Sequence, residues 1–163
     1  MSGLRLRPAV RAIVLDPDDR VALVRFRFPH GDVWATPGGG IEEGEPEEHA
    51  LARELDEELG LVLAVEELGP VVWVRTHVVP LGGGRWDGQT ERYRLQRVAA
   101  RFELRPRLSA EQLAAEAVME VRWWALDEVV GATGVEFAPR RFPELLPALL
   151  RDGAPLVPFD VGV

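Results

Sequence analysis

The stretch GGGIEEGEPEEHALARELDEELGL, from Gly38 to Leu61, carries an unusual concentration of negative charge. Nine carboxylates fall in the seventeen residues from Glu42 to Glu58, and Arg53 is the single basic residue among them. Like charges at helical spacing repel one another by roughly a few tenths of a kcal/mol per pair. Because a chain seldom gathers that repulsion in one place, the stretch predicts that a cation binds here.

The acidity of the chain is local. The net charge is −8, and the nine acids and one base of Glu42–Glu58 contribute all of it, since the remaining 18 acids are balanced by 18 arginines. Binding to a nucleic-acid duplex needs a basic surface. We therefore expect a small-molecule ligand and no nucleic-acid partner.

Two missing residue types exclude several kinds of chemistry. The chain has no cysteine, which excludes disulfides, thiolate nucleophiles and cysteine-ligated zinc. All 19 basic residues are arginine, so no lysine is present for a Schiff base or for a phosphate-binding P-loop.

The length of 163 residues suits a single domain, 1–163, with one sizeable core. No apolar run is long enough to cross a bilayer. The N-terminal residues, up to Asp16, have the pattern of a first strand rather than of a signal peptide. We expect a cytoplasmic protein with no membrane partner.

Hydrophobic periodicity and turn residues divide the chain into strands and helices. Strands are expected at Leu4–Asp16 and Arg20–Phe28, within Pro29–Gly40 and Leu61–Leu81, over Glu91–Leu104, and from Glu120. A helix is expected from Pro46, at the N1 position, to about Leu59, with Gly60 at C′. One helical turn is expected within Ser109–Ala117, a short helix follows the strand from Glu120 and ends at Val130, and a last helix covers Arg140–Gly153. This mixture predicts an α/β or α+β fold, a mixed sheet with helices on its faces.

The helix after Pro46 places its carboxylates on one face. Glu54, Glu57 and Glu58 are related by spacings of three and four residues, and Arg53 lies four residues before Glu57. Carboxylate oxygens suit Mg²⁺ or Mn²⁺ better than zinc. Leucines at every fourth position, Leu51, Leu55 and Leu59, give the same helix an apolar stripe that would anchor it. The alternative is a solvated acidic face whose early glutamates only favour the helix dipole.

The spacing of this stretch also resembles a known family. Gly39, five residues, Glu45, seven residues and then RELDEELGL from Arg53 to Leu61 match every fixed position of the Nudix box. This chain is similar to the Nudix hydrolases over those 23 residues, and more weakly over most of its length. The resemblance implies an α/β/α sandwich with a central mixed sheet. It also implies hydrolysis of a nucleoside diphosphate linked to another moiety, with Mg²⁺, or Mn²⁺ in its place, as the cofactor.

The same resemblance implies roles for individual residues. Glu57 and Glu58 would be metal ligands, Glu54 a ligand or the base that activates water, and Arg53 would orient a glutamate. Glu45 would hold the loop or contribute to the metal site, and Gly38 would offer its carbonyl to the metal. Glycines 38–40 let backbone approach an ion or a phosphate closely, so Gly39 and Gly40 are candidates for binding substrate.

Residues outside the box are less well determined. The family often recruits one further acid from a distant loop, and Glu116 and Glu120 are the candidates, with Glu116 preferred because a loop side chain can swing towards a metal. The alternative is that both are ordinary surface acids. Arg25 and Arg27 alternate on one strand face and are candidates for binding phosphate; the alternative is ordinary surface arginines. Trp34 is a candidate for stacking on a base, and the alternative is a core position.

Marks that distinguish substrate classes in the family are mostly absent. A proline typical of ADP-ribose hydrolases would fall at residue 77, which is His77, and Tyr93 lies too far along the chain for the dinucleoside-polyphosphate pattern. Nucleoside triphosphates, oxidised ones included, and nucleotide sugars remain, with ADP-ribose and dinucleoside polyphosphates as alternatives. The loop Gly82–Gln89, which contains Trp86, is where we expect specificity.

Two other classes of protein share the fold that this resemblance implies. Isoprenoid diphosphate isomerases of this fold use a cysteine, which this chain lacks. A non-catalytic nucleotide sensor remains an alternative, although such proteins typically lose glutamates of the box and this chain keeps them all. A homodimer is common in the family and is a candidate here.

Overall fold

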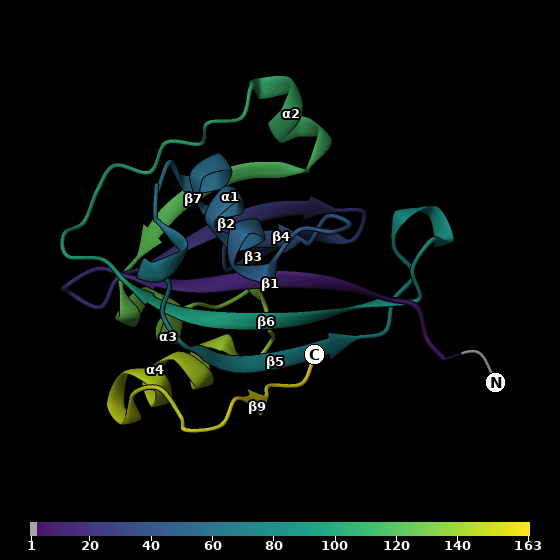
Figure 1. Ribbon diagram of the computed structural model, residues 1–163. Coiled ribbons are helices and arrows are strands. Elements are labelled where there is room, and N and C mark those ends of the chain that lie inside the picture. Colours follow the sequence, from purple (N-terminus) through teal and green to yellow (C-terminus); the bar gives the residue numbers. More distant parts are fainter. Residues whose placement is uncertain (1–2) are drawn as a thin grey trace.

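The computed structural model describes residues 3–163, so the first two residues of the predicted domain lie outside the described part. Nine strands form one mixed sheet in the order β8-β3-β2-β1-β6-β5-β9, with β4 pairing with β1 and β7 with β2. Figure 1 shows α1 and α2 on one side of this sheet and α4 on the other. The structure is an α/β/α sandwich, as the sequence predicts.

The nine strands include three that the sequence did not predict, β4, β8 and β9, and the other six fall in predicted ranges with somewhat different limits. The strands are β1 (Leu6–Leu15), β2 (Val21–Phe28), β3 (Gly31–Ala35), β4 (Gly38–Gly40), β5 (Val71–His77), β6 (Gly88–Arg97), β7 (Val118–Trp124), β8 (Glu136–Ala138) and β9 (Phe159–Asp160). The helices are α1 (Glu47–Leu59), α2 (Ala110–Ala115), α3 (Leu126–Gly131) and α4 (Phe142–Asp152), with short 3₁₀ turns η1 (Val65–Glu67) and η2 (Gly82–Gly84). Among residues 3–163, no helix is both long enough and apolar enough to span a membrane.

Three predicted boundaries are wrong. The range Leu61–Leu81 holds one strand, β5, preceded by η1. The strand predicted to reach Leu104 ends at Arg97, because β1, the strand that pairs with it throughout, ends at Leu15. Pro46 is the N-cap of α1 rather than N1, since its ψ of 144° is extended rather than helical.

Two apolar cores lie on opposite faces of the sheet. The core under α1 contains Leu51, Leu55 and Leu59, all fully buried, which confirms the predicted stripe. Burying each such side chain contributes about 1.5–3 kcal/mol, so the stripe holds α1 rigidly. The opposite core lies under α3 and α4 and is rich in aromatic side chains, among them Trp73, Trp124 and Phe142.

Strand β1 brings the two halves of the site together. It pairs with β2 only near its end, at Leu15, while its middle residues Ala9 to Arg11 pair with β4. On its other edge β1 runs parallel to β6 over its whole length. The glycine strand that precedes α1 is therefore held directly against a central strand of the sheet.

Candidate active site

Helix α1 presents two buried glutamates. Glu54 and Glu58 are only 7% and 1% exposed, whereas the other acids of α1 are half-buried. They lie one helical turn apart, on the side of α1 that faces β4, so the leucine stripe that seats the helix also buries both carboxylates. Burial without a direct guanidinium partner is unusual for a carboxylate such as that of Glu58.

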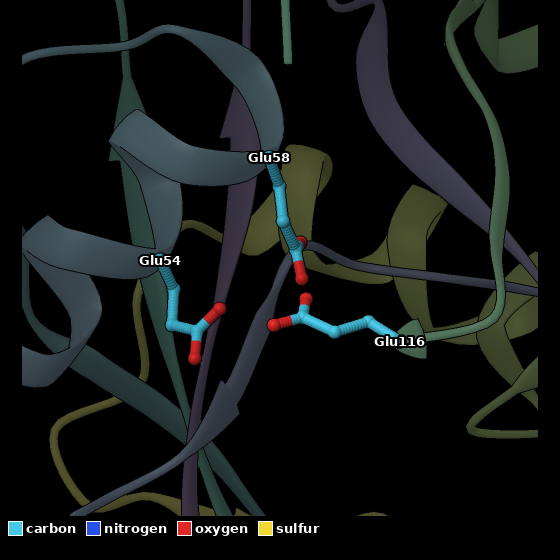
Figure 2. Close-up of side chains that lie close together, drawn as sticks. All are labelled: Glu54, Glu58 and Glu116. Carbon is cyan, nitrogen blue, oxygen red and sulfur yellow. The ribbon is translucent and has the colours of Figure 1, made fainter. Parts of the chain in front are cut away.

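A third glutamate approaches from the opposite side. One carboxylate oxygen each of Glu54, Glu58 and Glu116 lie within 4.8 Å of one another. Figure 2 shows the first two descending from α1 and Glu116 reaching towards them from the end of α2. We call these three side chains the carboxylate cluster.

The backbone around Glu116 explains why this acid, and not Glu120, joins the cluster. Ala117 has a positive φ of 59°, which turns the chain sharply between Glu116 and β7. The register of β7 against β2 then shifts by a residue, so that Val118 packs under α1 while Glu120 lies opposite Arg25 on the other face. There Glu120 pairs with Arg25 at 3.4 Å.

Arg53 holds the acids around the cluster. Its Nε and Nη2 donate to the two carboxylate oxygens of Glu45 at 2.9 and 3.0 Å, a bidentate contact. Its Nη1 donates to Glu54 at 3.0 Å and to Glu57 at 3.4 Å. The predicted contact with Glu57 is present, but the structure adds Glu45 and Glu54. Glu57 itself lies outside the carboxylate cluster.

Each glycine of β4 admits a close neighbour. A Cβ atom at Gly38 would clash with the carbonyl of Val10, and Gly38 also has φ of 144°. A Cβ atom at Gly39 would lie 2.5 Å from the carboxylate of Glu54, and one at Gly40 would overlap the guanidinium of Arg7. The glycines thus allow the protein's own charged groups to approach the turn.

The backbone N–H and carbonyl of Gly38 both form hydrogen bonds with side chains. Its N–H donates to Glu58 Oε2 at 3.1 Å, and its carbonyl accepts a hydrogen bond from Arg11 Nη1 at 3.2 Å. The sequence predicted only that the carbonyl would face a metal.

Burial and mutual repulsion raise the pKa values of the cluster. Burial raises the pKa of Glu58 well above its ordinary value, and the neighbouring Glu54 raises it further. Burial also raises the pKa of Glu54 and of Glu116, and the charge of Glu57 adds to both shifts. The pKa of Glu45 moves the opposite way, because Arg53 donates hydrogen bonds to its charged form. Shifts of this kind are typical of functional sites.

The predicted substrate-binding side chains on β2 and β3 have other contacts. Arg25 and Arg27 pair with Asp32 at 3.0 and 3.3 Å. Trp34 packs edge-on against Trp124, at 5.0 Å between ring centroids, and belongs to the core under α4. None of these contacts is with the carboxylate cluster, so the proposed substrate role of these three residues stays a prediction.

Sequence reasoning missed Arg7, Arg11 and Glu91. Arg11 is half-buried on β1 and donates to Glu91 at 2.9 Å, and Glu91 is 2% exposed. Arg7 lies over Gly40, and its charge lowers the pKa of Glu116, against the larger effect of burial. The available signal was an arginine interrupting an apolar strand, Val10 to Leu15. This pattern does not reveal which residue pairs with Arg11, because its partner Glu91 lies 80 residues away in the sequence.

The carboxylate cluster suits a hard divalent cation. It offers oxygen atoms only, they converge, and burial disfavours their shared negative charge unless a cation balances it. Mg²⁺ and Mn²⁺ are the ions that such a donor set prefers. An α/β/α sandwich with converging acidic oxygens beside a glycine turn is an arrangement that could hold a divalent cation.

Comparison with known proteins identifies the family. The NUDIX domain model matches residues 5–146. The chain is 32% identical to Nudix hydrolase 25 of Arabidopsis thaliana over 132 residues, which are 76% of this chain and 75% of that protein. The chain belongs to the Nudix hydrolase family.

Two further similarities extend this result. An RNA pyrophosphohydrolase of a Sulfurovum strain is 38% identical over 99 residues, which are 56% of this chain and 62% of that protein. A solved MutT NUDIX hydrolase from Burkholderia pseudomallei is 26% identical, with a TM-score of 0.63, covering 86% of this chain and 97% of that one.

Proposed function

We propose that this chain hydrolyses a pyrophosphate bond in a nucleoside triphosphate, oxidised or not, or in a nucleotide sugar, with Mg²⁺ or Mn²⁺. The observation that carries the proposal is the convergence of three carboxylates, two of them buried, at the glycine turn. Burial raises the pKa of Glu58, so its charged form gains stability when a cation binds beside it.

The residues would divide the work as follows. Glu54, Glu58 and Glu116 would hold the metal, with Glu57 as a further ligand. The carbonyl of Gly38, a ligand by resemblance to the family, already accepts a hydrogen bond from Arg11, so a metal would have to use its second lone pair. Bound metal would neutralise the pyrophosphate and lower the pKa of a water molecule. Glu54, whose pKa burial raises, is suited to accept the proton of that water. Arg53 would keep Glu54 and Glu57 in place through the hydrogen bonds it donates.

Substrate phosphates would meet the backbone of Gly39 and Gly40 together with Arg7, which lies over Gly40. The loop Gly82–Gln89 remains our candidate for specificity. It is tied to the start of β1 by an ion pair between Arg5 and Asp87 at 3.0 Å, two residues before Arg7. This places the loop on the side of the molecule from which Arg7 approaches the site.

The RNA pyrophosphohydrolase relatives favour a second substrate class. The acidic charge of the chain argues against a nucleic-acid partner, but the terminal phosphates of an RNA need only enter the site itself. An RNA with a 5′-triphosphate therefore belongs among the substrates to be tested, as do ADP-ribose and dinucleoside polyphosphates.

Other features of the proposal concern the whole molecule. We propose that the chain forms a single domain, since the strands from β1 to β9 all belong to one sheet. We also propose a cytoplasmic location, where nucleotides are abundant, and a homodimer by analogy with the family.

A phosphate-release screen tests the proposal. Each substrate class would be incubated with Mg²⁺ and with Mn²⁺, using the wild-type protein, Glu58→Gln and Glu48→Gln. Glu48 is the matched control, because it lies on the same helix but pairs with Arg94 at 3.0 Å outside the cluster. We expect one class to be hydrolysed, an at least hundredfold loss in Glu58→Gln, as large as or larger than losses typical of residues that support ligands, and wild-type activity in Glu48→Gln. Nucleotide binding without turnover of any class would contradict the proposal and support a sensor.

A further inference from the structure

A buried network on the α4 side of the sheet reaches the turn that precedes α1. Glu91 on β6 accepts hydrogen bonds from Arg11 Nε at 2.9 Å and from the hydroxyl of Tyr93 at 3.0 Å, and it also accepts one from Arg75. Glu91, Arg75 and Tyr93 are each less than a tenth exposed. With its carboxylate held by three donors, Glu91 gives the guanidinium of Arg11 a fixed position.

The guanidinium of Arg11 also binds the turn formed by Thr36–Gly38. Its Nη1 donates to the carbonyls of Thr36 and Gly38, each at 3.2 Å. The carbonyl between them, that of Pro37, accepts from the backbone N–H of Ala12 at 3.0 Å. Three consecutive carbonyls of the turn are thus held by two adjacent residues of β1.

The turn is connected to the carboxylate cluster by a hydrogen bond from Gly38 to Glu58. Fixing the peptide planes on both sides of Pro37 and Gly38 also fixes the direction of the Gly38 N–H, which donates to Glu58 Oε2 at 3.1 Å. Glu58 is 1% exposed, and this is the one hydrogen bond that its carboxylate makes among the described residues. A carboxylate with a single backbone donor depends on where that donor points.

We propose that Arg11 is a positioning residue, anchored by Glu91, that orients the Thr36–Gly38 turn so that Gly38 holds Glu58 in its metal-binding position. The inference rests on the proposed function for its consequence but makes its own claim about the turn. A lysine could not replace Arg11, because its compact ammonium group lacks the planar fork that reaches Glu91 and the carbonyls together.

The test compares two arginines in similar settings. Arg11→Lys keeps the charge opposite Glu91 and removes the fork. Arg94→Lys is the matched control, because the side chain of Arg94 is also 15% exposed and also donates both to a backbone carbonyl, that of Gly69, and to a glutamate, Glu48. Both variants would be measured with the full chain by amide hydrogen exchange at Gly38 without metal, and by titration with Mn²⁺ alone.

In Arg11→Lys we expect the Gly38 amide to exchange about tenfold faster, as loss of a hydrogen-bonded support allows. We expect Mn²⁺ to bind about tenfold more weakly, at the lower end of the effect of residues that orient ligands. Arg94→Lys should match wild type in both. A purely structural role for Arg11 would lower the melting temperature and leave both measurements unchanged, which would overturn the proposal.

A second variant covers failure of Arg11→Lys to fold. Tyr93→Phe removes one donor from Glu91 and touches nothing in the turn. It should shift Gly38 exchange and Mn²⁺ affinity in the same direction by a smaller factor, and wild-type values of both would overturn the proposal. A wild-type protein that binds no Mn²⁺ would refute the proposed function, whereas unchanged Gly38 exchange in the variants would refute only this inference.

Discussion

Two buried groups of charge lie on opposite faces of the same sheet and differ in how they are balanced. In the carboxylate cluster, Glu58 has one backbone donor and two acidic neighbours, and burial raises its pKa well above the ordinary value. In the network on the other face, burial by itself would raise the pKa of Glu91, but Arg11 and Arg75 outweigh it and bring the pKa to about 2.

The comparison separates a glutamate that stabilises the fold from one kept for function. Glu91 gains two guanidinium partners and a hydroxyl, so folding favours its charge. Glu58 loses solvent and gains repulsion, so folding disfavours its charge until a cation arrives. The two glutamates are similarly buried, yet a negative charge stabilises the fold at Glu91 and destabilises it at Glu58.

The largest effect is expected at Glu91. Glu91→Gln leaves the buried Arg75 and the half-buried Arg11 without their counter-charge, and breaking a buried pair typically destabilises by about 3–5 kcal/mol. Urea unfolding with metal chelated would measure it. The control is Glu103→Gln, which breaks an exposed pair with Arg105 and should change stability by less than about 1 kcal/mol. Similar stabilities of the two variants would contradict the account of Glu91.

The same residue predicts how stability changes with pH. The pKa of Glu91 lies lower in the folded protein than its ordinary value of 4.5, so its contribution is present above 4.5 and is lost as the pH falls towards about 2. The stability difference between wild type and Glu91→Gln should therefore shrink across that range. Unfolding curves at a series of pH values would show it, and a constant difference would argue against a charged Glu91.

The next comparison lies within the site. Glu116→Gln should lower activity about tenfold, since it removes one acid of the carboxylate cluster from an exposed position. Glu120→Gln should leave activity within a factor of about two, because Glu120 pairs with Arg25 on the other face. Turnover of the substrate found by the screen measures both. Equal losses would mean that the turn at Ala117 does not select between them.

The smallest effect has the opposite sign to the first. Without metal, Glu58→Gln should raise the free energy of unfolding by about 1 kcal/mol, as is common when a strained functional group is removed. The amide keeps an oxygen for the Gly38 N–H and removes the buried charge. Urea unfolding in the presence of a chelator measures this gain, and a loss of stability would mean that the charge of Glu58 is already balanced by Arg11, whose charge lowers its pKa.

Local interactions account for the parts that could be predicted from sequence. Leu51, Leu55 and Leu59 share one face of α1 because of helical spacing, and that spacing also puts Glu54 and Glu58 together one turn apart. Gly60 ends α1 with φ of 71°, as its position after the last leucine predicted. These relations involve residues within a few positions of each other, so the sequence contains both partners.

Tertiary structure decided the remainder, because it depends on strand pairing and register. The box spacing predicted acids at the site, but only the positive φ of Ala117 and the shifted register of β7 made Glu116 rather than Glu120 their neighbour. Only the parallel pairing of β1 with β6 brought Arg11 to Glu91, eighty residues away. By itself the sequence determined the helix, its carboxylate face and the family, since these follow from short-range spacing. Which distant charges balance or join those carboxylates was settled by how the strands pack, because a one-residue change of register moves a side chain to the opposite face.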